Sequence, residues 1–151
     1  MTGAPRRKPT PWEDREQRAL VTWFDRQYPR LANLLQATPN GGKRNRITAA
    51  TMKATGTRAG VPDLFLAIPP GLWIELKVTE DKALGRKRGR LSDVQKEMIA
   101  QLRAAGWRVE VCYGWQAAQA VIKDFMQQTH ASVPCLSARG GRVLFNLEDS
   151  K

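Results

Sequence analysis

Three charged side chains interrupt the most apolar stretch of this sequence, residues 60–78. Asp63 opens the apolar run "DLFLAI", and Glu75 and Lys77 lie inside the run "LWIELKV". If both runs are β-strands, the alternation of side chains puts Glu75 and Lys77 on one face and their apolar neighbours on the other. Charged residues are almost never fully buried unless they are paired, so these three are the first candidates for chemistry.

A hairpin would bring the two acids together. The turn signal "PPG" separates the runs, so the two strands can pair antiparallel. Both acids lie on one face in any register in which the numbers of paired residues add up to an even total. The register that pairs Asp63 with Glu75 is one of these. Directly opposed side chains have Cβ atoms about 4.5–5.5 Å apart. Like charges at that spacing cost stability unless something neutralises them.

A divalent cation would neutralise this pair. Oxygen ligands with open positions suit Mg²⁺ or Mn²⁺, which can polarise a phosphate and lower the pKa of an attacking water. Lys77 would then place positive charge where negative charge grows in the transition state. The hairpin is thus a candidate site for cutting phosphodiesters. In the structural alternative, Asp63 caps a turn after Pro62, while Glu75 and Lys77 form a solvated strand face or an ion pair.

Composition points to a polyanionic partner. The 151 residues, enough for one domain with its own core, include 25 Lys and Arg against 14 Asp and Glu, a formal net charge of +11. Such charge attracts phosphate backbones, and salt weakens the attraction. Cys112, Cys135 and the one histidine cannot supply a tetrahedral zinc site. With no apolar leader and no run long enough to span a bilayer, we expect a soluble, cytoplasmic protein with reduced thiols.

The hairpin is expected within a mixed α/β domain. Residues 1–9 form a basic arm, 10–128 the domain, and 129–151 a tail in which "RVLFNL" can add a strand. Within the domain we expect a helix from Pro11, with Thr10 as its N-cap, then a short strand over 34–37 and a short helix over 48–55. The two hairpin strands follow. After them we expect a helix from 92 to about 105, a strand over 107–113 and a helix from 115 to about 128. The main elements follow the order α-β-β-β-α-β-α, a central mixed sheet flanked by helices.

Several segments of the sequence resemble motifs of the PD-(D/E)xK nuclease superfamily and follow one another in the family's order. The resemblance is closer to the VRR-NUC branch of this superfamily, especially to its small stand-alone phage forms. The resemblance runs over roughly residues 12–125 and rests on "EDREQRALVTWFDRQYP", "PNGGKRN", "KATGTRAGVPDLFL", "LWIELKV" and "LSDVQKEMIAQLRAAGWRVEVC". It implies a restriction-endonuclease-like core and Mg²⁺- or Mn²⁺-dependent hydrolysis of DNA phosphodiesters. Asp63 and Glu75 would be metal ligands with the backbone carbonyl of Leu76, and Lys77 the catalytic lysine.

Two further positions match family motifs. The first-helix pattern E-x-x-x-Q assigns a metal-ligand role to Glu13, with Gln17 as its companion one turn on, and Glu16 is the runner-up. Glu13 can equally close a capping box with Thr10. In the S-x-x-Q pattern, Gln95 would join the catalytic set near the metal or water, although it too can merely close a capping box.

Two basic segments are predicted to bind DNA: the loop "NGGKR", which resembles the family's Gly-rich loop, and the run "KALGRKRGR" just beyond the predicted active strand. Glycines permit close approach to phosphate and basic side chains bind it, so we assign DNA contacts to Asn40, Gly41, Gly42, Lys43 and Arg44. We also expect DNA backbone contacts from Lys82, Arg86, Lys87, Arg88 and Arg90. Plain solvated loops are the alternative in both cases. The five tryptophans could include a base-stacking platform, but core packing is the usual role.

Taken together, these residues favour a DNA endonuclease that acts on branched or structured DNA in phage replication, recombination or repair. The family resemblance suggests a homodimer resolving four-way (Holliday) junctions, because two-fold symmetry offers paired sites for paired strands. His130 is expected in the exposed tail, which leaves metal-bound water as the nucleophile. The rivals are a non-catalytic basic nucleic-acid-binding protein and an RNA-binding or ribosomal protein.

Overall fold

The computed structural model describes residues 11–38, 46–130, 135–136 and 142–143. The predicted arm 1–9, the N-cap Thr10, the loop Asn40–Arg44 and most of the tail therefore lie outside the described residues. No helix in the described part of the chain is both long and apolar enough to cross a bilayer.

A four-stranded mixed sheet forms the centre of the fold. The strands are β1 (Leu35–Ala37), β2 (Leu64–Leu66), β3 (Leu72–Lys77) and β4 (Arg108–Tyr113), and they lie in the order β1-β2-β3-β4. β2 pairs antiparallel with β1 and β3, whereas β3 and β4 run parallel. The parallel pair needs a crossover, which the intervening helix supplies.

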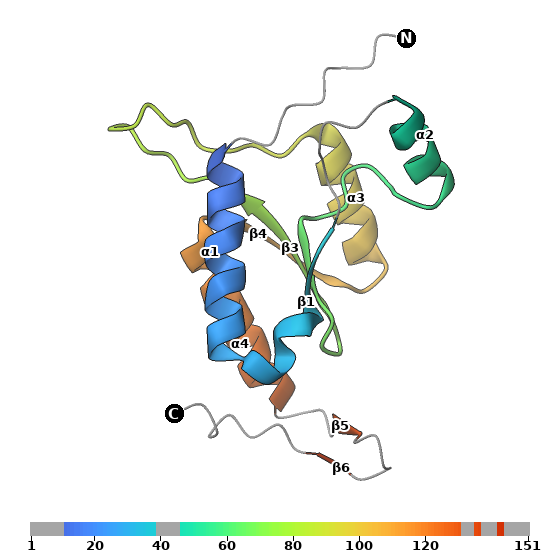
Figure 1. The fold of residues 1–151 in the computed structure, drawn as a ribbon, viewed down its shortest axis with the longest axis vertical. Helices are drawn as coiled ribbons and strands as arrows, with labels where there is room; N and C mark the ends of the chain where they lie inside the picture. The colour runs from blue at the N-terminus through green and yellow to red at the C-terminus, as the bar shows by residue number, and fades with distance from the viewer. Residues whose placement is uncertain (1–10, 39–45, 131–134, 137–141, 144–151) are drawn as a thin grey trace.

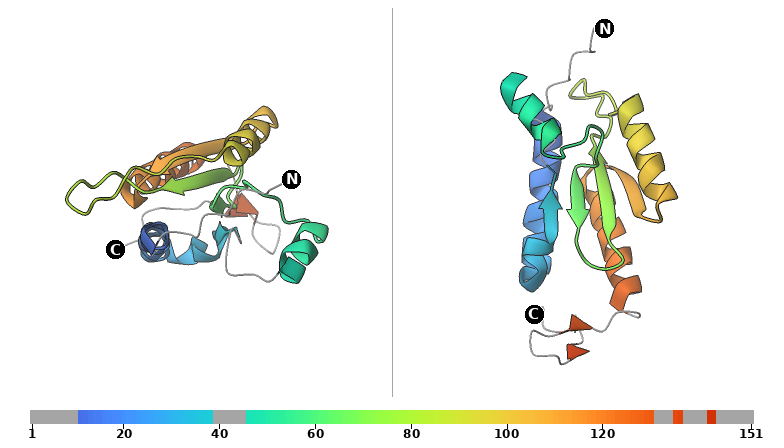
Figure 2. Two further views of the ribbon diagram at one scale, coloured as in Figure 1. Left: turned by 90° about the horizontal axis from the view of Figure 1, so that it is seen from above. Right: turned by 90° about the vertical axis from the view of Figure 1, so that its right-hand side faces the viewer.

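Helices cover both faces of this sheet. α1 (Pro11–Gln27) and α4 (Trp115–His130) pack against each other and against β3, while α3 (Asp93–Ala104) packs against β4 from the other side (Figures 1 and 2). A 3₁₀ helix, η1 (Pro29–Leu34), links α1 to β1, and α2 (Arg46–Ala54) lies between β1 and β2 in the chain. The predicted α/β class and the order of the main elements are confirmed.

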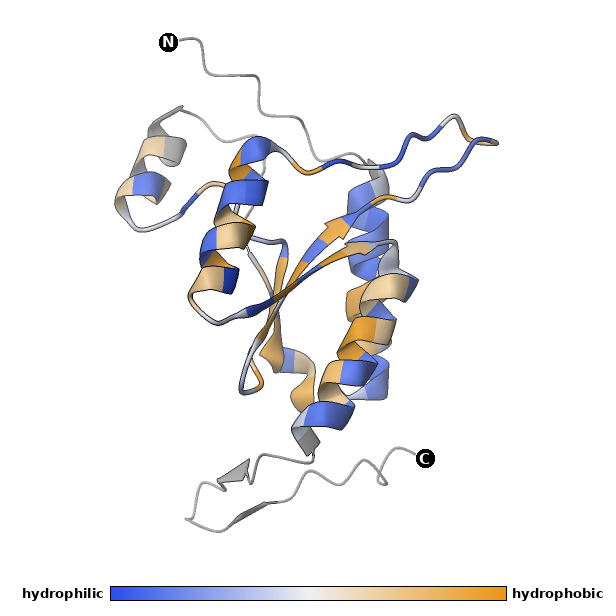
Figure 3. Cartoon of the chain, turned by 180° about the vertical axis from the view of Figure 1, so that it is seen from behind, coloured by the Kyte–Doolittle hydropathy of each residue, from blue (hydrophilic) through white to orange (hydrophobic). Residues whose placement is uncertain are grey.

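The core lies between the sheet and the α1–α4 pair. Alternate residues of β2 and β3 point into it and are fully buried together with side chains of both helices: Leu64, Leu66, Leu72, Ile74, Leu20, Phe24 and Ile122. Figure 3 shows the apolar strands enclosed by amphipathic helices. Because α3 covers the opposite face, β3 is buried on both sides near its end.

The tryptophans flank the core rather than fill it. Trp23 and Trp115 are partly buried against it, and Trp73 packs on Phe65 with ring centroids 4.5 Å apart and ring planes tilted by 36°. Trp107 is 40% exposed.

At the C-terminal end, β5 (Cys135–Leu136) and β6 (Arg142–Val143) form a separate two-stranded antiparallel sheet. Of the strand anticipated in "RVLFNL", the described part is β6, which does not join the four-stranded sheet.

Candidate active site

The register of the β2–β3 hairpin places the two predicted acids face to face. Leu64 pairs with Ile74, Phe65 with Trp73, and Leu66 with Leu72. One step beyond the first of these pairs, the same register sets Asp63 opposite Glu75, as the sequence pattern predicts. The rings of Phe65 and Trp73, which are in contact, occupy the same face two pairs further along the strands.

Asp63 is fixed to its neighbouring strands by the backbone. Its Oδ2 accepts a hydrogen bond from the Leu76 N–H at 2.8 Å. Its carbonyl oxygen accepts from the Thr38 N–H at 2.8 Å, and the Thr38 hydroxyl donates to the carbonyl of Pro62. The carboxylate therefore lies beside the Leu76 peptide group. The role predicted for the Leu76 carbonyl stays a prediction.

Glu75 and Lys77 form a buried ion pair. The Lys77 Nζ lies 2.5 Å from Glu75 Oε1, and the two side chains are 8% and 0% exposed. The ion pair considered as a structural alternative thus exists, but it is enclosed rather than solvated. Glu75 Oε1 also accepts a hydrogen bond from the Gln95 side chain. Glu75 Oε2 is buried and has no hydrogen-bond partner among the described residues.

These surroundings raise the pKa of Glu75 to about 7. Burial is the largest cause, because it disfavours the charged carboxylate, and the negative charge of Asp63 adds to it. The hydrogen bond and charge of Lys77 act in the opposite direction, and Glu13 raises the pKa further. A carboxyl perturbed by burial and a nearby acid is typical of functional sites.

Gln95 performs both of the roles that its motif allows. The Ser92 hydroxyl accepts from the Gln95 N–H at 3.2 Å, and Gln95 Oε1 accepts from the Ser92 N–H at 3.0 Å, which closes a capping box at the start of α3. The nitrogen of the same side-chain amide donates to Glu75. Helix capping and contact with the site are therefore combined in one residue.

The two candidate glutamates of α1 have different surroundings. Glu16 Oε2 accepts a hydrogen bond from the Trp115 N–H at 2.8 Å, so Glu16 holds the N-terminus of α4. Glu13 is close enough to Glu75 to raise its pKa. Of the two glutamates, Glu13 is the one whose charge raises the pKa of Glu75, and its role as a metal ligand stays a prediction.

The described residues contain no group of three or more His, Cys, Asp or Glu side chains that could hold a metal ion. Mg²⁺, however, is commonly held by one or two carboxylates, with water and substrate phosphate completing its shell. Two opposed carboxylates and an unpartnered buried oxygen match that donor set. The residues present therefore fit a divalent cation.

Comparison with known proteins decides the family. The family model of the VRR-NUC domain matches residues 10–116, which include Asp63, Glu75, Lys77 and Gln95. The chain belongs to the VRR-NUC domain family. A solved structure described as "VRR_NUC domain protein" is similar, with a TM-score of 0.62 and 26% sequence identity over 84% of this chain and 92% of that chain. No curated protein matches the sequence. The VRR-NUC domain is a nuclease family, and its restriction-endonuclease-like fold is the one predicted.

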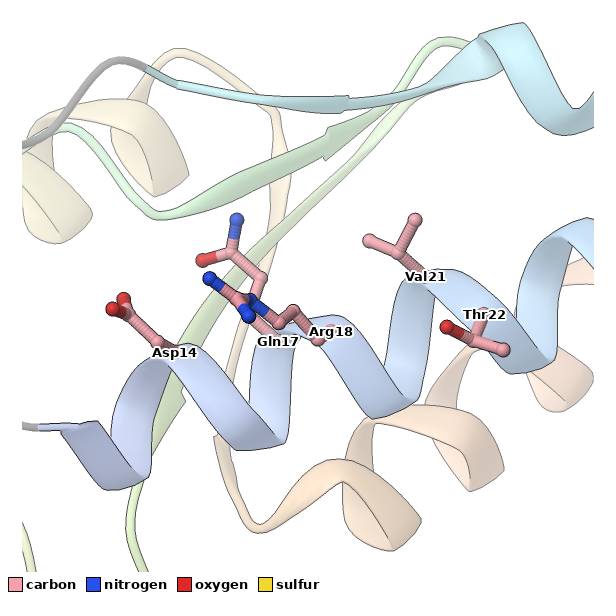
Figure 4. Close-up of a pocket in the computed structure, with 5 residues that line it drawn as sticks. All are labelled: Asp14, Gln17, Arg18, Val21 and Thr22. Carbon is pink, nitrogen blue, oxygen red and sulfur yellow. The ribbon is translucent and has the colours of Figure 1, made fainter.

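A pocket lies along α1 of this VRR-NUC domain. It is lined by Asp14, Gln17, Arg18, Val21 and Thr22 (Figure 4). All five belong to one helix, so the pocket is a hollow on the helix surface rather than a chamber enclosed by the sheet. Gln17, the predicted companion of Glu13, thus lines this hollow on the surface of α1.

Beyond Lys77, the VRR-NUC chain continues into a basic hairpin, residues 78–90. Four of the five basic residues predicted to bind DNA are exposed: Lys82, Lys87, Arg88 and Arg90. Arg86 is partly buried and donates to the backbone and hydroxyl oxygens of Thr79 at 2.9 and 3.0 Å. Arg88 is exposed, but its guanidinium lies 3.8 Å from the ring centroid of Tyr113. Arg88 therefore also holds the hairpin to β4, while Arg86 braces the hairpin internally.

Gly89 is a site residue that the sequence pattern did not reveal. It is buried, and a Cβ on it would lie 3.2 Å from Lys77 Cβ and 3.2 Å from the Val78 nitrogen. The returning arm of the hairpin thus packs directly on the stem of Lys77. The only signal in the sequence is a glycine within a basic run, which by itself reads as an ordinary turn residue.

Proposed function

We propose that this VRR-NUC domain is a Mg²⁺- or Mn²⁺-dependent endonuclease that hydrolyses phosphodiester bonds in branched or structured DNA. The observation that carries the proposal is the environment of Glu75. Lys77 and Gln95 share one oxygen of this buried carboxylate, the other oxygen has no partner among the described residues, and Asp63 stands opposite it.

Each residue of the candidate site would have its own role in the reaction. Asp63 and Glu75, with the Leu76 carbonyl and with Glu13 from α1, would hold the ion. A bound divalent cation would polarise the scissile phosphate and lower the pKa of an attacking water. Lys77 would place its ammonium group against negative charge that develops on the phosphate. Gln95 would keep the Glu75 carboxylate in one orientation.

The charge of the protein supports the substrate class, and a proposed homodimer would fit it. A net charge of +11 and an exposed basic hairpin next to Lys77 suit a long polyanion held by its backbone. In a homodimer, two-fold symmetry would present two such sites to two strands, the arrangement that resolution of a Holliday junction requires. We propose that reaction, in phage replication, recombination or repair, as the specific activity.

The test is a cleavage assay on end-labelled four-way junction, flap and linear duplex, with Mg²⁺, Mn²⁺ or EDTA. We expect cleavage only with metal, and most on the junction. Asp63→Asn and Glu75→Gln should bind DNA with unchanged affinity and cut nothing, because each loses a ligand charge but leaves the basic surface intact. Glu97→Gln, the same exchange at an exposed position of α3, is the matched control.

Two outcomes would contradict the proposal. Binding without cleavage on every substrate and with both metals would leave a non-catalytic nucleic-acid-binding protein. Full activity in Glu75→Gln would move the chemistry away from this hairpin. Sedimentation of the protein with and without junction DNA tests the dimer separately.

A further inference from the structure

We propose that Leu84, at the tip of the basic hairpin, inserts between stacked bases of the bound DNA and opens one base step near the cut. This inference rests on the proposed function, because it takes DNA as the partner. It adds a means of selecting DNA that can be unstacked, such as a branch point, over uniform duplex.

The hairpin is a built element with a closed tip. Asp81 and Arg86 exchange two backbone hydrogen bonds of 2.8 Å, and the Gly89 N–H donates to the Val78 carbonyl at 3.0 Å. Asp81 Oδ1 accepts from the Leu84 N–H at 3.2 Å. Gly85, next to Leu84, has a φ of +63°, which favours glycine, and this fixes the turn.

The base of the hairpin is fastened to the domain. The Arg86 guanidinium lies 5.2 Å from the ring centroid of Trp12 in α1. Arg88 lies over Tyr113 at the end of β4. The hairpin therefore projects past α1 from a fixed base (Figure 1). A side chain presented by a preorganised element loses less conformational freedom on binding.

Leu84 has little part in the core. Its side chain is 60% exposed, the highest value among the exposed large hydrophobic residues in the described part of the chain. Figure 3 shows the hairpin as a hydrophilic strip with an apolar end. Apolar side chains used in this way, leucine among them, partly unstack base steps and kink DNA.

The charge around the tip favours DNA over a second copy of the chain. The hairpin carries five basic residues, Lys82, Arg86, Lys87, Arg88 and Arg90, against two acids, Glu80 and Asp81. A symmetric contact between two tips would bring like charges together, which disfavours that pairing. Phosphates on both sides of a base step complement the same charges.

The reach of the hairpin sets where the open step should lie. Leu84 is seven residues beyond Lys77. At about 3.3 Å per extended residue, the tip lies at most about 23 Å from the start of the hairpin. With a rise of about 3.4 Å per base pair, the opened step should fall within about seven steps of the cut.

The experiment reads unstacking without requiring cleavage. A 2-aminopurine is moved step by step through a four-way junction and a duplex, and its fluorescence is measured with the full chain in Ca²⁺. We expect a rise at one step in the wild type and in Leu84→Met, and none in Leu84→Ser. The loss of one inserted leucine should also weaken binding by about fivefold. Val94→Ser, at another exposed apolar residue that is 51% exposed, is the matched control and should behave as the wild type.

Several results would overturn the inference. The first is a fluorescence rise that is equal in Leu84→Ser and in the wild type. The second is a loss of the fluorescence rise in Val94→Ser as large as that in Leu84→Ser. The third is a change in sedimentation of Leu84→Ser without any change in fluorescence, which would assign the tip to contact with a second copy of the chain. A chain that cuts DNA but shows no Leu84-dependent rise would keep the proposed function and lose the insertion. A chain that shows the Leu84-dependent fluorescence rise but never cuts DNA would keep the insertion and lose the proposed function.

Discussion

Gln95 donates a hydrogen bond from its side-chain amide to Oε1 of Glu75, and so connects the start of α3 to the buried end of β3. The amide cannot turn freely, because its oxygen is occupied by the Ser92 N–H. Helix capping thus orients the nitrogen toward the carboxylate. The same contact leaves Glu75 Oε2 as the oxygen that has no partner among the described residues.

Two alanine variants should separate capping from catalysis. Ser92→Ala and Gln95→Ala both break the capping box, so each should lower the free energy of unfolding by about 1 kcal/mol. Only Gln95→Ala also removes the donor to a charged group, and it should slow cleavage by at least about tenfold. Urea denaturation and single-turnover cleavage of junction DNA measure the two effects. Equal cleavage by both variants would mean that Gln95 is only a cap.

The two glutamates of α1 should divide stability and activity between them. Glu16→Ala removes the acceptor for the Trp115 N–H and should cost about 1 kcal/mol of stability while cleavage is retained. Glu13→Ala should leave stability nearly unchanged and reduce cleavage, because its charge acts on Glu75. The same denaturation and cleavage measurements apply. If Glu16→Ala were stable but inactive, the role in cleavage would belong to Glu16 instead of Glu13.

Much of the site could be predicted because its signals are local. A period of two residues along each strand and a "PPG" turn between them leave few registers, and the structure has the one that opposes Asp63 and Glu75. The S-x-x-Q pattern also has a local cause, since a capping box spans three residues.

The rest depends on contacts between distant parts of the chain. Glu16 and Trp115 are 99 positions apart, and no local pattern joins them. Likewise, the sequence left open whether Glu75 and Lys77 face solvent. They are buried because β4 and α3, which follow later in the chain, enclose β3. The placement of Arg86 against α1 depends on tertiary packing in the same way.

Gly89 should act as a positioning residue for Lys77. In Gly89→Ala the new methyl group would press on the stem of Lys77, and we expect cleavage to fall by about tenfold with DNA binding unchanged. Moving the ammonium away from Glu75 should also raise the pKa of that carboxyl and shift the pH profile of cleavage upward. Ala83→Ser, a small change at an exposed position of the same hairpin, is the control. An unshifted profile in Gly89→Ala would remove the glycine from the site.

The exposed basic residues of the hairpin should set the salt dependence of binding. Replacing Lys82, Lys87 and Arg90 by glutamine should lower the slope of log affinity against log salt by up to about 3, one per lost phosphate contact. Arg86→Gln alone should instead loosen the hairpin, because that side chain is bonded to Thr79. Fluorescence anisotropy at several salt concentrations gives both slopes. A triple variant with the wild-type slope would place the DNA elsewhere.

The raised pKa of Glu75 predicts how stability changes with pH in the metal-free protein. The folded chain binds this proton with a pKa of about 7, against an ordinary value of 4.5, so it keeps the proton at pH values where the unfolded chain has lost it. This contribution is fully present below about pH 4.5 and is lost as the pH rises to about 7. Glu75→Gln has no such proton, so its stability relative to the wild type should increase across this window. Urea denaturation in EDTA from pH 4 to 8 measures the difference, and Glu97→Gln should show no such trend. A constant difference would mean that Glu75 is ionised in the fold throughout, held by Lys77 and Gln95.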